Sequence, residues 1–79
     1  MENRIDDIQR LTDAIAASPE DIDLYAERGK AYFKAHDFGN ALNDFNKVLS
    51  LEPNHVEVGQ YVEMINEILA YRYTDIYNP

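Results

Sequence analysis

The feature that most constrains the fold of this chain is an internal repeat with a period of 34 residues. Pro19 and Pro53 are 34 positions apart, and the residues before each proline match in character. The same shift places apolar side chains on apolar side chains: Ile8 on Leu42, Leu11 on Phe45, Ala14 on Val48 and Ile15 on Leu49. A repeat of this length predicts helical pairs that stack on one another, because one pair alone cannot bury its apolar face.

Four segments carry apolar residues at intervals of three and four positions, the spacing that places side chains on one face of a helix. They predict four helices, near residues 2–17, 21–35, 38–51 and 55–72. Gly29 lies inside the second helix, where glycine costs about 1 kcal/mol relative to alanine, so it indicates a close approach by another helix. No alternating pattern is long enough for a β-sheet, and the expected fold class is all-α.

The turns between these helices account for the residues that a search for catalytic groups would select first. His36 tolerates a positive φ better than most residues, and Asp37 is a favourable N-cap for the third helix. Adjacent residues rarely point at one substrate, so His36 and Asp37 predict a turn rather than a proton-transfer pair. His55 and Glu57 offer two ligands where zinc needs three or four, so we expect His55 at a helix start instead. Asn54 and Glu57 resemble a capping pair for the fourth helix.

The central residues resemble the tetratricopeptide repeat family, whose signature is W-x2-L-G-x2-Y, then A-x3-F, then P. The matching slots hold Tyr25 in place of tryptophan, Gly29, Tyr32, Ala41, Phe45 and Pro53. Arg28 departs from the signature, because leucine is usual there. The resemblance is weaker toward the C-terminus, where the signature slots hold Gly59, Glu63 and Asn66.

This resemblance implies antiparallel helix pairs stacked as a short right-handed α-solenoid of about four helices. One full repeat spans about residues 22–55, with half repeats at 1–21 and 56–73, so residues 1–73 form a single domain. Residues 74–79 are expected to form a C-terminal tail that packs as a cap over the end of the stack.

Composition limits the classes of partner and of chemistry. The net charge is −8, from 15 acidic and 7 basic residues, which disfavours binding to nucleic acids and to anionic membranes. The chain has no cysteine, and its apolar runs are far shorter than the ~20 residues that span a bilayer. The polar, acidic N-terminus does not resemble a targeting peptide, so we expect a cytoplasmic protein. We find no constellation of catalytic, cofactor-binding or metal-binding residues, and we expect no enzyme activity.

The resemblance also implies where a partner would bind, because the first helix of each repeat lines the concave face that holds peptides. The corresponding residues are Asp23, Ala26, Lys30, Phe33 and Lys34. Lys30 and Lys34 form a small basic strip suited to an acidic or C-terminal peptide group. The alternative is a solvated face whose lysines pair with nearby acids, since surface charges usually contribute little. We expect a non-catalytic protein-interaction module that binds a peptide or helix of a protein partner there.

The C-terminal segment predicts an alternative function. Four of its side chains are apolar enough to bury, and with Tyr61 they offer a surface for tail docking or self-association; they are Tyr71, Tyr73, Ile76 and Tyr77. Stable stacks of this kind usually need at least about three repeats, and this chain has one repeat with two halves. The alternative is therefore a self-associating structural or regulatory subunit, a homodimer formed through the fourth helix and the tyrosine-rich tail.

Overall fold

Four helices follow one another along the chain in the computed structural model, which describes the backbone of residues 4–77 and the side chains of residues 7–71. They are α1 (Arg4–Ala17), α2 (Ile22–Lys34), α3 (Phe38–Leu51) and α4 (Val56–Tyr77). No strand occurs within residues 4–77, so the all-α prediction is confirmed. The bounds of α2 and α3 agree with the predicted bounds to within one residue. None of the helices, over the described residues, has the length and apolar character needed to cross a membrane.

Aspartates start the second and third helices. Asp21 accepts a hydrogen bond from the backbone N–H of Asp23 at 3.1 Å, which caps α2. Asp37 accepts one from the N–H of Asn40 at 3.4 Å, which caps α3. His36, just before Asp37, has a φ of 61°, the left-handed conformation that only some side chains tolerate. The predicted turn at His36 and Asp37 is therefore confirmed.

The start of α4 has a different capping residue from the one predicted. The backbone N–H of Val58 donates to Nδ1 of His55 at 3.2 Å. An unprotonated imidazole nitrogen is a good acceptor, and His55 takes the role predicted for Asn54. The prediction that His55 lies at the helix start is confirmed, and the choice of Asn54 as the capping residue is wrong.

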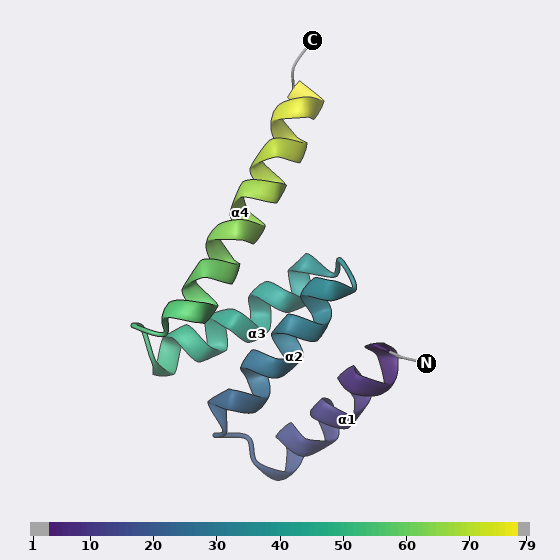
Figure 1. Ribbon diagram of the computed structural model, residues 1–79, viewed down its shortest axis with the longest axis vertical. Helices are drawn as coiled ribbons and strands as arrows, with labels where there is room; N and C mark the ends of the chain where they lie inside the picture. Colours follow the sequence, from purple (N-terminus) through teal and green to yellow (C-terminus); the bar gives the residue numbers. More distant parts are fainter. Residues whose placement is uncertain (1–3, 78–79) are drawn as a thin grey trace.

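Each helix packs mainly against the next one along the chain, so the helices form a short stack of pairs (Figure 1). α2 contacts α1 on one side and α3 on the other, and α3 also contacts α4. The close approach predicted at Gly29 is confirmed, because a Cβ atom there would lie 2.5 Å from Cε1 of Phe45. A larger side chain at this position would overlap with the buried Phe45 ring.

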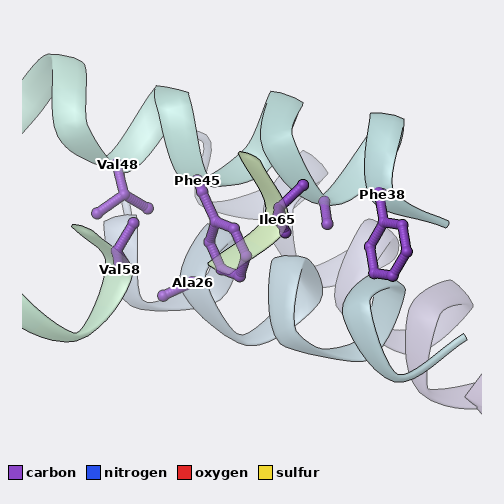
Figure 2. Packing of buried hydrophobic residues seen from close by; sticks show 7 residues of the cluster. Ala26, Phe38, Phe45, Val48, Val58 and Ile65 are labelled. Carbon is purple, nitrogen blue, oxygen red and sulfur yellow. The ribbon is translucent and has the colours of Figure 1, made fainter. Parts of the chain in front are cut away.

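The third helix supplies most of the core. Its buried side chains meet others from α2 and α4 between the three ribbons (Figure 2). The buried cluster consists of Phe38, Ala41, Phe45 and Val48 from α3, Ala26 from α2, and Val58 and Ile65 from α4. Phe45, Val48 and Ile65 are completely buried. Since α3 contacts both neighbours through this cluster, it fixes α2 and α4 relative to each other.

A charged network that the sequence did not predict joins α1, α2 and α3. Arg28 donates two hydrogen bonds of 2.8 Å to the carboxylate of Asp44 and one of 3.1 Å to Oγ1 of Thr12. The side chains of Arg28 and Asp44 are only 18% and 6% exposed. The rings of Tyr25 and Tyr32 flank the guanidinium at 6.0 and 5.8 Å. The hydrogen bond to Asp44 raises the pKa of Arg28 against the opposing effect of burial, so Arg28 stays charged.

The last helix is longer than the others. α4 has 22 residues, whereas the other three have 13 or 14. Figure 1 shows it extending well past the α2–α3 turn. It continues through Tyr77, so the predicted helix end near residue 72 is wrong and residues 74–77 are helical. The capping role predicted for residues 74–79 stays a prediction, because the side chains of 72–77 and all of residues 78 and 79 lie outside the described part.

Candidate functional site

Side chains of α2 and α4 meet on one side of the molecule, although α3 separates the two helices in the chain. Lys30 of α2 reaches Glu57 of α4, with Nζ 3.4 Å from Oε2. Phe33, about one turn further along α2, packs edge to face against Tyr61 of α4, with ring centroids 5.1 Å apart and an interplanar angle of 78°. These two contacts join the C-terminal half of α2 to the first turns of α4.

Helical spacing identifies the other residues on this side. On α2, intervals of four, three and four residues place Asp23, Glu27 and Lys34 on the same face as Lys30. On α4, intervals of three and four extend the face from Glu57 toward the C-terminus. We call these residues the α2–α4 face: Asp23, Glu27, Lys30 and Lys34 from α2, and Glu57, Gln60, Met64, Glu67 and Tyr71 from α4.

Lys30 is held by two carboxylates of the chain itself. Its Nζ lies 3.4 Å from Oε2 of Glu27 and 3.4 Å from Oε2 of Glu57, and its side chain is 24% exposed. Burial lowers the pKa of Lys30, but the two carboxylates together raise it by more, so the net shift is upward. Lys30 therefore stays charged at neutral pH, and its charge is balanced inside the chain.

Aromatic side chains pack against one another next to the Lys30–Glu57 contact. Phe33 also packs against Phe38 with ring centroids 5.5 Å apart and an interplanar angle of 61°. Tyr61 stacks on Phe45 at 5.2 Å, with an interplanar angle of 27°. Edge-to-face and offset stacked pairs contribute about 0.5–1.5 kcal/mol each beyond burial. Phe33 and Tyr61 therefore hold α2 against α4, and each is half-buried, with part of its ring open to solvent.

The five α2 residues predicted to contact a partner lie in different environments. Asp23 and Lys34 are exposed, and Lys34 lies in the last turn of α2, where a cation favours the helix dipole. Lys30 and Phe33 are half-buried in the contacts with α4. Ala26 is only 6% exposed and belongs to the core cluster, so little of its surface is available to a partner. Partner binding by these residues stays a prediction.

The residues predicted for self-association or tail docking lie on α4. Tyr61 is half-buried against Phe33 and Phe45, whereas Tyr71 is 76% exposed. The backbone of the other three predicted residues belongs to α4, but their side chains lie outside the described part: Tyr73, Ile76 and Tyr77.

An apolar stripe on α4 was missed by sequence reasoning. Met64 is 43% exposed and lies between Tyr61 and Ile68 in helical register. Intervals of three, four and three residues connect Tyr61, Met64, Ile68 and Tyr71, which we call the α4 stripe. The interval of three residues from Tyr61 to Met64 was the available signal, but sequence alone does not say which side of a wide apolar helix is covered.

The residues that a search for catalytic groups would select first take part in the turn between α2 and α3. Asp37 uses its carboxylate as a helix cap and also accepts a hydrogen bond from Nδ2 of Asn40 at 2.8 Å. His36 is exposed in the turn, with its ring 5.9 Å from that of Phe38. Within the described residues, no three His, Asp or Glu side chains converge as metal ligands would.

Comparison with known proteins gives a family match over the central helices. Residues 22–55 match the family model described as Tetratricopeptide repeat. A stretch of 43 residues, 54% of this chain, is 42% identical to Protein SGT1 homolog from Oryza sativa subsp. japonica. The matched stretch spans only 12% of the length of that relative. No solved structure matches the chain significantly.

Proposed function

The chain belongs to the tetratricopeptide repeat family through residues 22–55, and from this premise we propose that it is a non-catalytic module that holds a peptide or helix of a partner protein on its α2–α4 face. Tetratricopeptide repeats are protein–protein interaction units, so the class of function follows from the family. The choice of face, the absence of catalysis and a cytoplasmic location belong to the proposal.

The observation that carries the proposal is the alignment of α2 and α4 by the Lys30–Glu57 and Phe33–Tyr61 contacts. A partner that lies on this side touches two helices fixed relative to each other, so binding does not require the loss of their relative freedom. Preorganisation of this kind lowers the entropic cost of association. Half-buried aromatic rings next to exposed polar side chains supply both apolar contact and hydrogen-bonding groups.

Exposed positions allow a test that leaves the fold intact. Lys34→Glu alters the α2 part of the face, and Gln60→Arg alters the α4 part. Lys47→Glu and Asn46→Arg make the same changes at exposed positions of α3. Lys30→Glu is less suitable, because it would place a third carboxylate beside Glu27 and Glu57.

Affinity capture from native lysate, followed by mass spectrometry, provides the measurement. We expect each face variant to change the amount of captured partner by about tenfold, in a direction set by the charge of that partner, and the α3 variants to leave it unchanged. Equal capture by all four variants, with unchanged circular dichroism, would remove the α2–α4 face as the binding site.

Self-association is a second candidate function, favoured by the exposure of Met64 and Tyr71 at 43% and 76%. Two copies could cover these side chains by pairing their α4 helices around a two-fold axis. The net charge of −8 on each copy opposes this pairing. Light scattering coupled to gel filtration decides the matter, and a monomer at high concentration rules this candidate out.

A further inference from the structure

We propose that the partner segment on the α2–α4 face is a basic amphipathic helix whose apolar side chains lie on the α4 stripe. This inference rests on the proposed function, because it specifies the partner chemistry of the same face. Three properties of the described residues support it: the spacing of the stripe, the charges beside it, and the internal pairing of Lys30.

The α4 stripe has the spacing of a surface that accepts another helix. Tyr61, Met64, Ile68 and Tyr71 follow one another at intervals of three, four and three residues. Tyr61 and Ile68 are half-buried and pack against the core cluster, so the stripe begins on rigid structure. Met64 and Tyr71 are the more exposed members, at 43% and 76%. A helix that presents apolar residues at the same spacing would cover them.

The charges that flank the stripe are mainly negative. On α4, Glu57 lies in line with the stripe one turn before Tyr61, and Glu67 lies beside the stripe between Met64 and Tyr71. Asp23 and Glu27 lie on the α2 part of the face, before the level at which the stripe begins. Among the described side chains, Glu67 has no cationic partner. With the chain carrying a net charge of −8, this face attracts a basic segment.

The two lysines of the α2–α4 face do not reverse its preference for a basic segment. Lys30 is bound by Glu27 and Glu57, each 3.4 Å from its Nζ, so it is not available to an acidic peptide. Lys34 is exposed at the C-terminal end of α2, and with Lys30 it gives two positive charges against the four acids of the face, a net charge of −2. An acidic partner would therefore meet net repulsion, and so would a second copy of this acidic chain.

Synthetic peptides of defined pattern test the proposal directly. The probe is a helical peptide with leucine at positions i, i+3, i+7 and i+10 and with lysine or arginine elsewhere. One comparison peptide carries glutamate at every basic position, and another is a scrambled basic peptide of identical composition. Calorimetric titration of the full chain at two salt concentrations measures affinity, and amide chemical shifts locate the binding surface.

Paired variants separate contact with the stripe from general charge attraction. Met64→Gln with Tyr71→Gln removes apolar contact at constant charge, and Asn66→Gln with Ala70→Gln makes matched changes on the opposite side of α4. Glu67→Lys alters the acidic flank, and Glu20→Lys makes the same change in the α1–α2 turn, away from α4. All six positions are exposed, and circular dichroism verifies the fold of each variant.

We expect the basic amphipathic peptide to bind, with affinity that falls as salt rises. The Met64 and Tyr71 double variant should weaken binding about tenfold, and its matched control less than about twofold. Glu67→Lys should weaken it roughly threefold and reduce the salt dependence, whereas Glu20→Lys should do so less.

Several results would overturn the proposal. The acidic peptide could bind as well as the basic one, or the scrambled peptide could bind as well as the amphipathic one. The double variant could leave affinity unchanged, or the chain could form a dimer that the double variant dissociates. If lysate capture still depends on Gln60 and Lys34 in any of these cases, the proposed function stands and only the chemistry of the partner is wrong.

Discussion

The helices α2 and α4 stand one repeat apart in the chain, but they are packed differently. α2 presents Gly29 to α3, and the missing side chain lets the Phe45 ring approach the backbone of α2. The position 34 residues later in α4 holds Glu63, which is exposed. In α2 this side is covered by the helix that follows it, whereas no described helix follows α4. α2 is therefore covered on two sides, and α4 is covered mainly by α3.

The same difference determines where surface is left open. α2 lies between α1 and α3, its N-terminus is capped by Asp21, and the Arg28 network joins its middle to both neighbours. α4 buries Val58 and Ile65 against the core, but leaves Met64 and Tyr71 exposed on a neighbouring side. The close-packed pair of α2 and α3 thus provides stability, and the one-sided packing of α4 provides the surface proposed for binding.

The largest effect should come from breaking the buried charge pair that distinguishes α2 from α4, which has Val62 at the corresponding position. Arg28→Met leaves the carboxylate of Asp44 buried without its partner, which should lower the free energy of unfolding by about 3–5 kcal/mol. A domain of this size has about that much stability, so the variant should be largely unfolded. Thermal unfolding followed by circular dichroism measures the loss.

Two further variants show whether the burial of the Arg28–Asp44 pair causes the expected loss of stability. Arg10→Met breaks the exposed ion pair with Asp7 and should cost at most about 1 kcal/mol. Replacing Arg28 and Asp44 together by leucine should recover most of the stability, because no charge is then left unpaired. A single Arg28→Met variant as stable as Arg10→Met would show that the network does not hold the three helices together.

Two glycines test the packing difference directly. Gly29→Ala places a Cβ atom 2.5 Å from Phe45, and the overlap should outweigh the gain in helix propensity, for a net loss of about 1–2 kcal/mol. At Gly59 a Cβ atom meets nothing within 4 Å, so Gly59→Ala should add up to about 1 kcal/mol. Urea unfolding of both variants gives the comparison. We expect Gly29→Ala to lower the free energy of unfolding and Gly59→Ala to raise it. Equal stabilisation by both substitutions would contradict the close approach of Phe45 to Gly29.

The helix cap at the α2–α3 turn should have a moderate effect. Asp37→Ala removes the acceptor for the N–H of Asn40, and the expected loss is about 1 kcal/mol. Asn43→Ala, at an exposed position inside α3, serves as the control and should change stability by less than about 0.5 kcal/mol. Both are measured by urea unfolding, and an Asp37→Ala variant as stable as the control would show that the cap contributes nothing.

The smallest effect should come from the charged link between α2 and α4. Lys30→Met removes contacts to Glu27 and Glu57, and partly exposed pairs of this kind contribute about 0–1 kcal/mol. Because the pKa of Lys30 is raised in the folded state, its contribution is fully present below the pKa of an unfolded lysine. It is lost as pH rises through the raised value.

Unfolding of the wild type and of Lys30→Met, at neutral and at strongly alkaline pH, tests whether the stabilisation by Lys30 is lost as pH rises. The stability difference should be constant around neutrality and should shrink at alkaline pH. A difference that grows with pH would mean that the carboxylates do not outweigh the burial of Lys30.

The candidate site was only partly predictable from the sequence. The resemblance indicated one side of α2, and Lys30 and Phe33 on that side contact α4. The neutralisation of Lys30 was not predicted, because Glu57 is 27 residues away and its reach depends on the placement of α4. The exposure of Met64 could not be deduced either, since a wide apolar helix surface does not reveal which part a neighbour covers.

The sequence by itself determined the four helices, the turn at His36 and Asp37, and the close approach at Gly29. These depend on periodicity, on local backbone preferences and on the size of single residues, all of which act over a few positions. The tertiary structure alone decided that Arg28 pairs with Asp44, that Lys30 is balanced by Glu57, and that one side of α4 stays open. Such contacts depend on how far each helix is rotated and shifted against its neighbour, which only the packing of the whole core fixes.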